Sequence, residues 1–364
     1  MPHSEACGRE CKGTKHRASK PSAYKIKQAK KAIKAKQDET TESEETGNSV
    51  AFELQQKCLN IFRDALQPRV DDTAVLQEVK GHLFNRDFDA AFGKEEYLRV
   101  YASRWSPARA VGFLQVLADV QHHVLGRQTD LDQLEIVCLG GGAGGEVVAL
   151  AGWWATMLES LPETALRARF VDVAAWDRTV AALHKGCVTP PELSKYASAA
   201  AREANHALLP KDKFSCTFLE QDVLSWQDPS MSSIITPTTK LVMLFFVLNE
   251  LYSASIPKTQ RLLAQLTSTM SAGSLLLVVD SPGSYSTVSI QGTEKQYPML
   301  WLLDHTLLES SRKADEEQIA AWQKVEDDQS RWFRLPTGLQ YPIQLEDMRY
   351  QIHLYRRLGG ATKR

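Results

Sequence analysis

The stretch EIVCLGGGAGGEVVALAGWW, residues 135–154, contains an apolar run, a glycine-rich turn and a helical pattern in direct succession. Five of the six residues from Gly140 to Gly145 are glycine. Glycines after a strand let the backbone turn sharply and let a ligand approach it closely, and the N-terminus of a following helix attracts negative charge. The stretch therefore predicts the first strand, turn and helix of an open α/β sheet, with a ligand bound at the turn.

Two ligand classes fit the spacing of these glycines. Gly140, Gly142 and Gly145 satisfy the G-x-G-x-x-G fingerprint of dinucleotide-binding proteins. Gly140, Gly142 and Gly144 equally satisfy the G-x-G-x-G spacing of methyltransferases that bind S-adenosylmethionine. The glycines alone leave both ligands open, so the choice depends on the rest of the chain.

Short apolar segments that alternate with helical patterns follow the first strand. The expected strands are residues 134–140, 166–173, 214–223, 240–251 and 273–284. Such alternation is typical of a parallel sheet with helices on both faces. Before it, residues 50–124 have a helical pattern, in which Ser106 is the expected N-cap and Pro107 the first residue of a helix that runs to about Val124.

The end of the chain separates the two ligand classes. Residues 330–336 and 348–358 are two expected strands, and the link between them contains Pro336, Gly338 and Pro342, which leave little room for a crossover helix. Strands joined without such a helix are antiparallel. A parallel sheet closed by an antiparallel hairpin indicates a class I methyltransferase, a Rossmann-like α/β fold with a seven-stranded sheet, and disfavours the alternative of an NAD-dependent oxidoreductase.

Charge divides the chain further. Residues 1–36 contain 11 Lys and Arg against two Glu, a net charge of +9, and residues 37–46 add five carboxylates. Such blocks are solvated, and a lysine-rich arm serves phosphate binding, nuclear import or only solubility. The expected domains are a disordered lysine-rich arm with an acidic patch (1–47), a helical subdomain (48–130) and a methyltransferase domain (131–364).

The composition excludes several classes of protein. The longest apolar run, residues 241–248, has eight residues, far short of the roughly 20 that a membrane helix needs. The six cysteines are scattered, as in proteins that keep their thiols reduced. Cys7 and Cys11 are close together, but their C-x3-C spacing is loose for zinc, and we expect no metal site. A soluble intracellular protein is expected.

The strand ends supply the expected cofactor site. Gly140, Gly142 and Gly144 would approach the methionine part of S-adenosylmethionine, and the helix N-terminus would attract its carboxylate. Asp172, at the end of the second strand, can accept hydrogen bonds from both ribose hydroxyls, whereas Asp177 is expected on the surface of the next helix. Asp222 can accept from the adenine amino group, or it is only a solvated loop residue.

Candidate catalytic residues follow the fourth and fifth strands. Asn249 and Tyr252 have the N-x-x-Y spacing with which nitrogen methyltransferases hold a planar target, although Glu250 and Leu251 replace the usual Pro-Pro, so the segment is also compatible with a structural turn. Glu250, if desolvated, and Asp280 are candidate bases. Methyl transfer needs alignment of the acceptor and no nucleophilic triad.

A further candidate substrate surface is the segment YASRWSPAR, residues 101–109. It brings together Arg104, Trp105 and Arg109, and arginines beside aromatic rings suit RNA phosphates and bases. The alternative is that Trp105 only fills the contact between the helical subdomain and the sheet.

Taken together, VCLGGGAGGEVVALAGW, FVDVAAWDRTV, LFFVLNELYS, LLLVVDSPGSYS and QYPMLWLLDHTLL, behind the lysine-rich arm and YASRWSPARA, resemble the fungal 25S ribosomal RNA (uridine-N3)-methyltransferases. The likeness spans nearly the whole chain from about residue 50. It implies an enzyme that uses S-adenosylmethionine to methylate N3 of one uridine in large-subunit rRNA, in the nucleus, nucleolus or cytoplasm. We expect it to act as a monomer, on rRNA or on a pre-ribosomal particle. Two alternatives stay open, a non-catalytic ribosome-assembly factor and a small-molecule methyltransferase.

Overall fold

The computed structural model describes residues 49–126, 132–283, 285–290, 293–309 and 320–359, all within the compact unit Ser49–Arg364. The expected arm, with Cys7 and Cys11, lies outside the described residues. No helix within the described ranges is long and apolar enough to span a bilayer.

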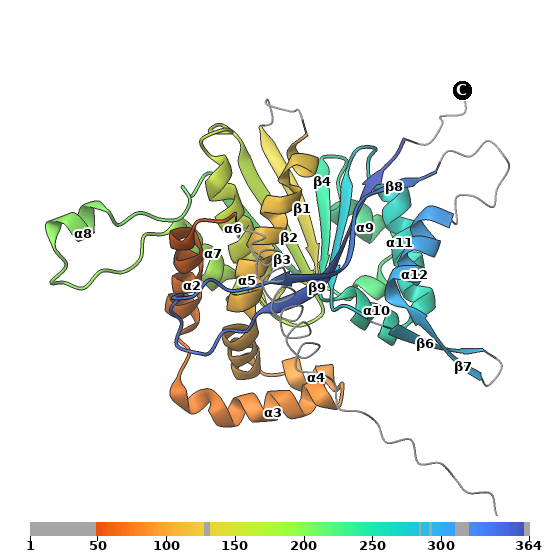
Figure 1. Cartoon of the computed structure of the whole chain (residues 1–364), viewed down its shortest axis with the longest axis horizontal. Coiled ribbons are helices and arrows are strands. Elements are labelled where there is room, and N and C mark those ends of the chain that lie inside the picture. Colours follow the sequence, from red (N-terminus) through yellow and green to blue (C-terminus); the bar gives the residue numbers. More distant parts are fainter. Residues whose placement is uncertain (1–48, 127–131, 284, 291–292, 310–319, 360–364) are drawn as a thin grey trace, which may run out of the picture. The chain divides into compact units, whose positions relative to one another are not determined.

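The strands and helices alternate along the chain as the sequence predicts (Figure 1). The strands are β1 (Gln133–Leu139), β2 (Ala165–Asp172), β3 (Phe214–Glu220), β4 (Thr239–Phe245), β5 (Leu275–Asp280), β6 (Tyr285–Ile290), β7 (Thr293–Pro298), β8 (Trp322–Phe333) and β9 (Met348–Arg357). The α-helices are α2 (Phe52–Leu66), α3 (Thr73–Phe84), α4 (Phe88–Phe92), α5 (Glu95–Leu125), α6 (Gly145–Met157), α7 (Asp177–Val188), α8 (Ala199–Glu203), α9 (Asp228–Ile234), α10 (Leu248–Ala254), α11 (Ile256–Thr269) and α12 (Met299–Asp304). Single turns are η1 (Val70–Asp72), η2 (Val223–Ser225) and η3 (His305–Glu309).

The main sheet has seven strands in the order β3-β2-β1-β4-β5-β9-β8. β1 to β5 pair in parallel, whereas β9 is antiparallel to both β5 and β8. This confirms the class I methyltransferase fold, including the closing hairpin. β6 and β7, which the sequence pattern did not predict, form a separate two-stranded sheet.

Alternate residues of each buried strand belong to two different apolar cores. Ile136 and Cys138 of β1 pack with α2, α5, α6 and α7, whereas Val137 and Leu139 pack with α9, α10, α11 and α12. Figure 1 shows the first group of helices to the left of the sheet and the second to the right. The near-continuous apolar strand sequence therefore follows from burial on both faces.

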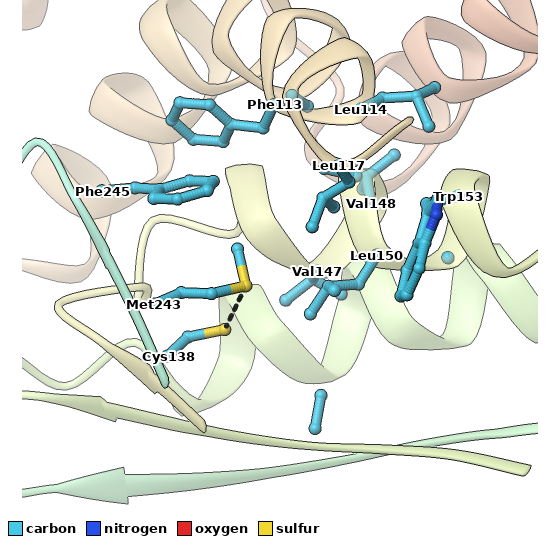
Figure 2. Close-up of a cluster of buried hydrophobic side chains, with 14 of the residues drawn as sticks. Phe113, Leu114, Leu117, Cys138, Val147, Val148, Leu150, Trp153, Met243 and Phe245 are labelled. Atoms are coloured by element: carbon cyan, nitrogen blue, oxygen red, sulfur yellow. Dashed lines mark hydrogen bonds between the residues drawn. The ribbon is translucent and has the colours of Figure 1, made fainter. Parts of the chain in front are cut away.

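Helix α5 is the long element that covers the strand end on the first face. Figure 2 shows Phe113 of α5 above Phe245 of β4, and their ring centroids are 4.7 Å apart. Beside them the Cys138 thiol lies 3.9 Å from the Met243 sulfur. Burial of one such large apolar side chain contributes about 1.5–3 kcal/mol to the free energy of unfolding. Helices α2 and α5 share this core with the sheet. The expected domain boundary near residue 130 stays a prediction.

The prediction that Pro107 begins a helix is wrong, because α5 runs without interruption from Glu95 and contains Pro107. Proline lacks the N–H that would bond the carbonyl four residues earlier. That carbonyl belongs to Ser103, and it accepts a hydrogen bond of 3.0 Å from the Tyr341 hydroxyl instead. A tertiary contact from a residue 238 positions away therefore satisfies the group that would otherwise end the helix.

Two other boundaries differ from the sequence pattern. The expected fourth strand to residue 251 ends at Phe245, because Phe246 has φ 55° and α10 begins at Leu248. A residue with positive φ cannot continue a strand. The Ala-rich stretch TPPELSKYASAAAREANHALL, residues 189–209, has a composition that predicts a helix, but only the five residues of α8 within it are helical.

Candidate functional site

The carboxyl ends of the parallel strands meet at one edge of the sheet, where the turn after each strand is tied to the neighbouring strand. Gly140, directly after β1, donates its N–H to the Val171 carbonyl at 2.7 Å. Phe246, directly after β4, donates to the Val279 carbonyl at 2.7 Å. In sheets of this kind ligands bind outside this edge, near the strand at which the order reverses. The sheet order places that point beside β1 and β4. We use the name strand-end crevice for this region, meaning the edge of the sheet at the carboxyl ends of β1, β2, β4 and β5.

The three spaced glycines of the turn have a structural cause. A Cβ atom added at Gly140, Gly142 or Gly144 would stand 2.6 Å from Val247, 2.0 Å from Trp176 and 2.2 Å from Leu183, respectively. Gly140 and Gly144 also have φ 83°, which side chains rarely adopt. Protein side chains therefore occupy the space that these glycines leave. Contact with a cofactor stays a prediction for all three.

Asp172 lies beside this turn at the end of β2. Its carboxylate accepts hydrogen bonds from the backbone N–H of Gly142 at 3.1 Å and of Ala174 at 3.2 Å. Burial raises the pKa of the Asp172 carboxyl, although these hydrogen bonds oppose the rise. The next residue, Val173, is 64% exposed, which is unusual for a large apolar residue beside a buried strand. The pair offers an acceptor for hydroxyls and an apolar surface for a flat ring. Asp177 is exposed at the start of α7, as expected.

Asp222 follows β3 and is exposed. Its side chain accepts the N–H of Leu224 at 2.9 Å and so caps η2. One carboxylate oxygen has this structural partner. The expected contact with an adenine amino group stays a prediction.

Asp280 is a buried carboxylate at the β5 end of the crevice. It ends β5, is 2% exposed, and accepts the N–H of Ser281 at 2.7 Å and of Asn249 at 3.0 Å. Burial raises the pKa of the Asp280 carboxyl to about 6, against the effect of these two hydrogen bonds. It is therefore held in one orientation and is ionised at neutral pH.

Glu250, the other candidate base, has a different environment. Its side chain is 41% exposed and forms an ion pair of 2.5 Å with Arg86, which precedes α4. The desolvation that would make Glu250 a good base is absent. The structure thus separates two carboxylates that the sequence pattern left equivalent.

The N-x-x-Y segment lies on α10. The amide oxygen of Asn249 is buried and has no hydrogen-bond partner among the described residues. Such an orphaned acceptor is costly unless a ligand satisfies it. Tyr252 is 1% exposed in the second apolar core, and burial raises the pKa of its hydroxyl. Contact of Tyr252 with a substrate stays a prediction and would require its ring to leave that core.

Glu146 is a site residue that the sequence analysis missed. It lies in the first turn of α6, is 5% exposed, and burial raises the pKa of its carboxyl to about 8. A hydrogen bond from its own backbone N–H and the charge of Arg109 oppose this rise, and the charge of Asp172 adds to it. The signal in the sequence was a single acid inside the otherwise apolar run GEVVALAGWW.

The residues of the expected RNA surface, 101–109, do not form one patch. Arg104 forms an ion pair with Glu346 and lies 5.9 Å from the Trp105 ring. Trp105 is half-buried and packs against Tyr101 with ring centroids 4.7 Å apart. Arg109 lies elsewhere, with its guanidinium 5.0 Å from the Phe246 ring at the end of β4. Arg109 is thus a residue of the crevice.

These groups fit S-adenosylmethionine on structural grounds. Val173 and Asp172 suit an adenosine, the carboxyls of Glu146 and Asp280 suit cationic groups, and Arg109 suits an anion. A nicotinamide dinucleotide would instead require the helix N-terminus at Gly145 to receive a pyrophosphate. The buried carboxyl of Glu146 occupies the first turn of that helix.

One characterised relative and several solved structures resemble the chain. The chain is 30% identical over 317 residues to the 25S rRNA (uridine(2843)-N(3))-methyltransferase of Saccharomyces cerevisiae. The match covers 81% of this chain and 82% of the yeast protein. The solved structures include the antibiotic-resistance methyltransferase Kmr (TM-score 0.33, 13% identity, 66% of this chain and 93% of that chain). Another is the N-methyltransferase NodS from Bradyrhizobium japonicum WM9 (TM-score 0.32, 10% identity, 67% and 96%).

A family model covers most of the same region. Its description is "Putative SAM-dependent methyltransferase", and it matches residues 62–356, well over half of the chain. The chain belongs to this family of S-adenosylmethionine-dependent methyltransferases.

Proposed function

We propose that this enzyme methylates N3 of a uridine in large-subunit ribosomal RNA. The observation that carries the proposal is the similarity to the yeast 25S rRNA enzyme, which extends over four fifths of both chains. The glycine turn, Asp172, Asn249 and Asp280 all lie within residues 62–356, the region of the family model.

The chemistry of uridine makes a specific demand on the site. N3 carries a proton and lies on the Watson–Crick edge, so the base must be unpaired and presented to the enzyme. The N3 proton must leave when the nitrogen forms its bond to the methyl carbon and the carbon–sulfur bond breaks. S-adenosylmethionine, when bound, supplies the methyl group, and the protein must supply the proton acceptor and the alignment.

Asp280 is suited to accept that proton. A pKa of about 6 leaves its carboxyl ionised at neutral pH while it stays basic enough to take a proton. The N–H groups of Ser281 and Asn249 hold the carboxylate at the end of β5. The unpaired amide oxygen of Asn249 lies on the adjoining helix and can accept a hydrogen bond from the presented base. We assign Asp280 as the general base and Asn249 as a group that positions uridine.

The cellular setting follows from the same proposal. An rRNA substrate places the enzyme in ribosome biogenesis and rRNA processing, in the nucleolus, nucleus or cytoplasm, acting as a monomer on free rRNA or on a pre-ribosomal particle. The lysine-rich segment 1–36 carries a net charge of +9 and would contribute salt-sensitive contacts to phosphates. Arg104 and Trp105 are the candidate contacts to RNA in the described residues.

Nucleoside mapping of rRNA tests the proposal. Large-subunit rRNA from cells that lack the protein should have lost one 3-methyluridine, and the purified full-length protein with S-adenosylmethionine should restore it on that rRNA or on pre-ribosomal particles. An unchanged nucleoside profile would overturn the rRNA proposal. Loss of the modification that only active protein restores, and Asp280→Asn does not, would exclude a purely structural assembly factor.

A further inference from the structure

Arg109 is a cation in the crevice for which the described part of the chain supplies no anionic partner. Its guanidinium lies over the Phe246 ring at 5.0 Å and donates to the Tyr101 hydroxyl at 3.3 Å. Among the described residues it forms no ion pair. Arg109 is partly buried, and a guanidinium presents a planar set of donors that suits a carboxylate or phosphate. The guanidinium is therefore available to bind an anion.

Helix α5 fixes the position of this guanidinium relative to the glycine turn. Ser106, one turn before Arg109, donates its hydroxyl to the Ala143 carbonyl at 2.7 Å. Phe113, one turn after Arg109, packs where a Gly145 side chain would be, 3.1 Å from the Cβ position. Residues at these spacings share one face of a helix. Arg109 therefore faces the crevice between the turn after β1 and the end of β4.

The backbone at Phe246 is strained in a way that serves the same arrangement. Phe246 has φ 55°, a conformation that costs an aromatic residue free energy and is most often retained at functional sites. The hydrogen bond of its N–H to the Val279 carbonyl holds this geometry. As a result the chain leaves β4 at Phe246, and the Phe246 ring lies beneath the Arg109 guanidinium.

The charges around Arg109 identify the anion that fits. Glu146 follows β1 and Asp280 ends β5. The positive charge of Arg109 acts to lower the pKa of both carboxyls. Glu146 lies in the first turn of α6, at the helix N-terminus that the sequence pattern assigned to the cofactor carboxylate. With a protein carboxyl already at that position, a second carboxylate needs its own cation.

We propose that Arg109 binds the α-carboxylate of the methionine part of S-adenosylmethionine, and that Glu146 receives the neighbouring α-ammonium group. An amino acid presents these two charges on one carbon, so a cation and a carboxyl on adjoining elements recognise both. This assignment replaces the expected contact of Arg109 with RNA phosphate. It rests on the cofactor and is independent of which RNA is methylated.

Calorimetric titration of the full-length protein tests the assignment. The two probes are S-adenosylmethionine and decarboxylated S-adenosylmethionine, which lacks only the carboxylate. Arg109→Gln should weaken S-adenosylmethionine about 10- to 100-fold, the range of a lost charge-assisted contact. Decarboxylated S-adenosylmethionine should bind wild type and variant with the same affinity within about twofold. Arg109→Lys should retain part of the affinity, since it keeps a point charge.

Arg178→Gln removes an exposed arginine that pairs with Glu95 on the outer surface, and it should change neither affinity. An equal loss for both probes in Arg109→Gln would show a packing role and overturn the proposal. Unchanged cofactor affinity together with a weaker affinity for rRNA would return Arg109 to phosphate binding and would also overturn it.

Discussion

The two halves of the strand-end crevice are built differently. On the β1–β2 side, contacts within the protein are already complete. Side chains fill the space beside each spaced glycine, and backbone N–H groups donate hydrogen bonds to the Asp172 carboxylate. On the β4–β5 side, polar groups have unmet capacity. Arg109 has no ion pair among the described residues, the Asn249 amide oxygen has no partner there, and Phe246 has a strained φ of 55°.

The difference separates shape from chemistry. A glycine motif can be strict because neighbouring side chains require it, without any ligand contact. Groups that recognise a ligand or move a proton are those whose hydrogen bonds or charges the protein leaves incomplete. Changes at the spaced glycines of the first side should therefore damage folding, and changes at the incomplete groups of the second should damage binding or catalysis while the fold persists.

Gly142→Ala should have the largest effect and should act on folding. The new methyl group would stand 2.0 Å from Trp176, a ring that is only 2% exposed. Relief requires this indole to leave the core or the turn to open, and core changes of this kind cost about 3 kcal/mol or more. Urea unfolding should show this loss in the free energy of unfolding.

Gly81→Ala is the matched control for this substitution. Gly81 lies in α3 with nothing within 4 Å of its Cβ position. The same change there should increase the free energy of unfolding by about 0.5–1 kcal/mol, because alanine favours a helix over glycine. A stable Gly142→Ala protein that has lost only cofactor binding would contradict the packing explanation of the motif.

Asp280→Asn should have the next largest effect and should act on catalysis. Removal of a general base reduces the rate of methyl transfer about 100-fold or more. The rate of the wild-type enzyme should rise with pH through about 6 and then level off, whereas the variant should lack this rise. Single-turnover methylation across pH 5–8 measures both.

The thermal stability of Asp280→Asn completes the test. Asparagine removes a buried charge, which stabilises the folded protein. Its NH2 group would also face one of the two backbone N–H donors, which destabilises it, so the two effects on stability oppose each other. We expect little change in Tm at pH 7. A large drop in Tm parallel to the loss of activity would assign Asp280 a structural role.

The sequence predicted what depends on local pattern. The strands predicted over 134–140 and 273–284 correspond to β1 and to the shorter β5, and two prolines and a glycine correctly indicated the antiparallel closing hairpin. Predictions failed where a distant residue decided the outcome. Pro107 lies inside α5 because the Tyr341 hydroxyl bonds the free carbonyl, and no local pattern reports that contact.

The candidate site shows the same limit. The strand-end rule brought Gly140, Asp172 and Asp280 to one edge, because parallel strands end together. It could not distinguish Asp280 from Glu250, since the Arg86 partner of Glu250 is 164 residues away. The burial of Glu146 was predictable from its apolar neighbours, but its closeness to Arg109 depends on how α5 packs on the turn.

Glu146→Gln should change how stability depends on pH. In the folded protein without cofactor the carboxyl has a pKa of about 8, against an ordinary value of 4.5. The stabilisation from its protonated form is complete below pH 4.5 and is lost as pH rises through 8. Between pH 6 and 8 the wild type should lose about 2 kcal/mol more than the variant, at 1.36 kcal/mol per pH unit.

Glu135→Gln provides the contrast for this experiment. Glu135 is also buried, at 6% exposure. Burial acts to raise the pKa of its carboxyl, but hydrogen bonds from Thr236, Thr238 and Arg169 outweigh burial and lower it. It is ionised in both states above pH 6, so this substitution should leave the pH 6–8 difference unchanged. Equal pH profiles for wild type and Glu146→Gln would show that Glu146 is ionised in the crevice.

The smallest effect is expected from Glu250→Gln. Glu250 and Arg86 are about half exposed, and exposed ion pairs contribute about 0–1 kcal/mol. Glu250→Gln, Arg86→Gln and the double variant should therefore each lose less than about 1 kcal/mol in urea unfolding, with a smaller difference at high salt. Methylation should stay within about threefold of wild type, because a half-exposed, paired carboxylate is a poor base at this edge. If Glu250→Gln instead lost methylation to the extent of Asp280→Asn while Arg86→Gln did not, the general base would be Glu250. The proton acceptor on the β4–β5 side would then be the exposed carboxylate of α10 and not the buried one of β5.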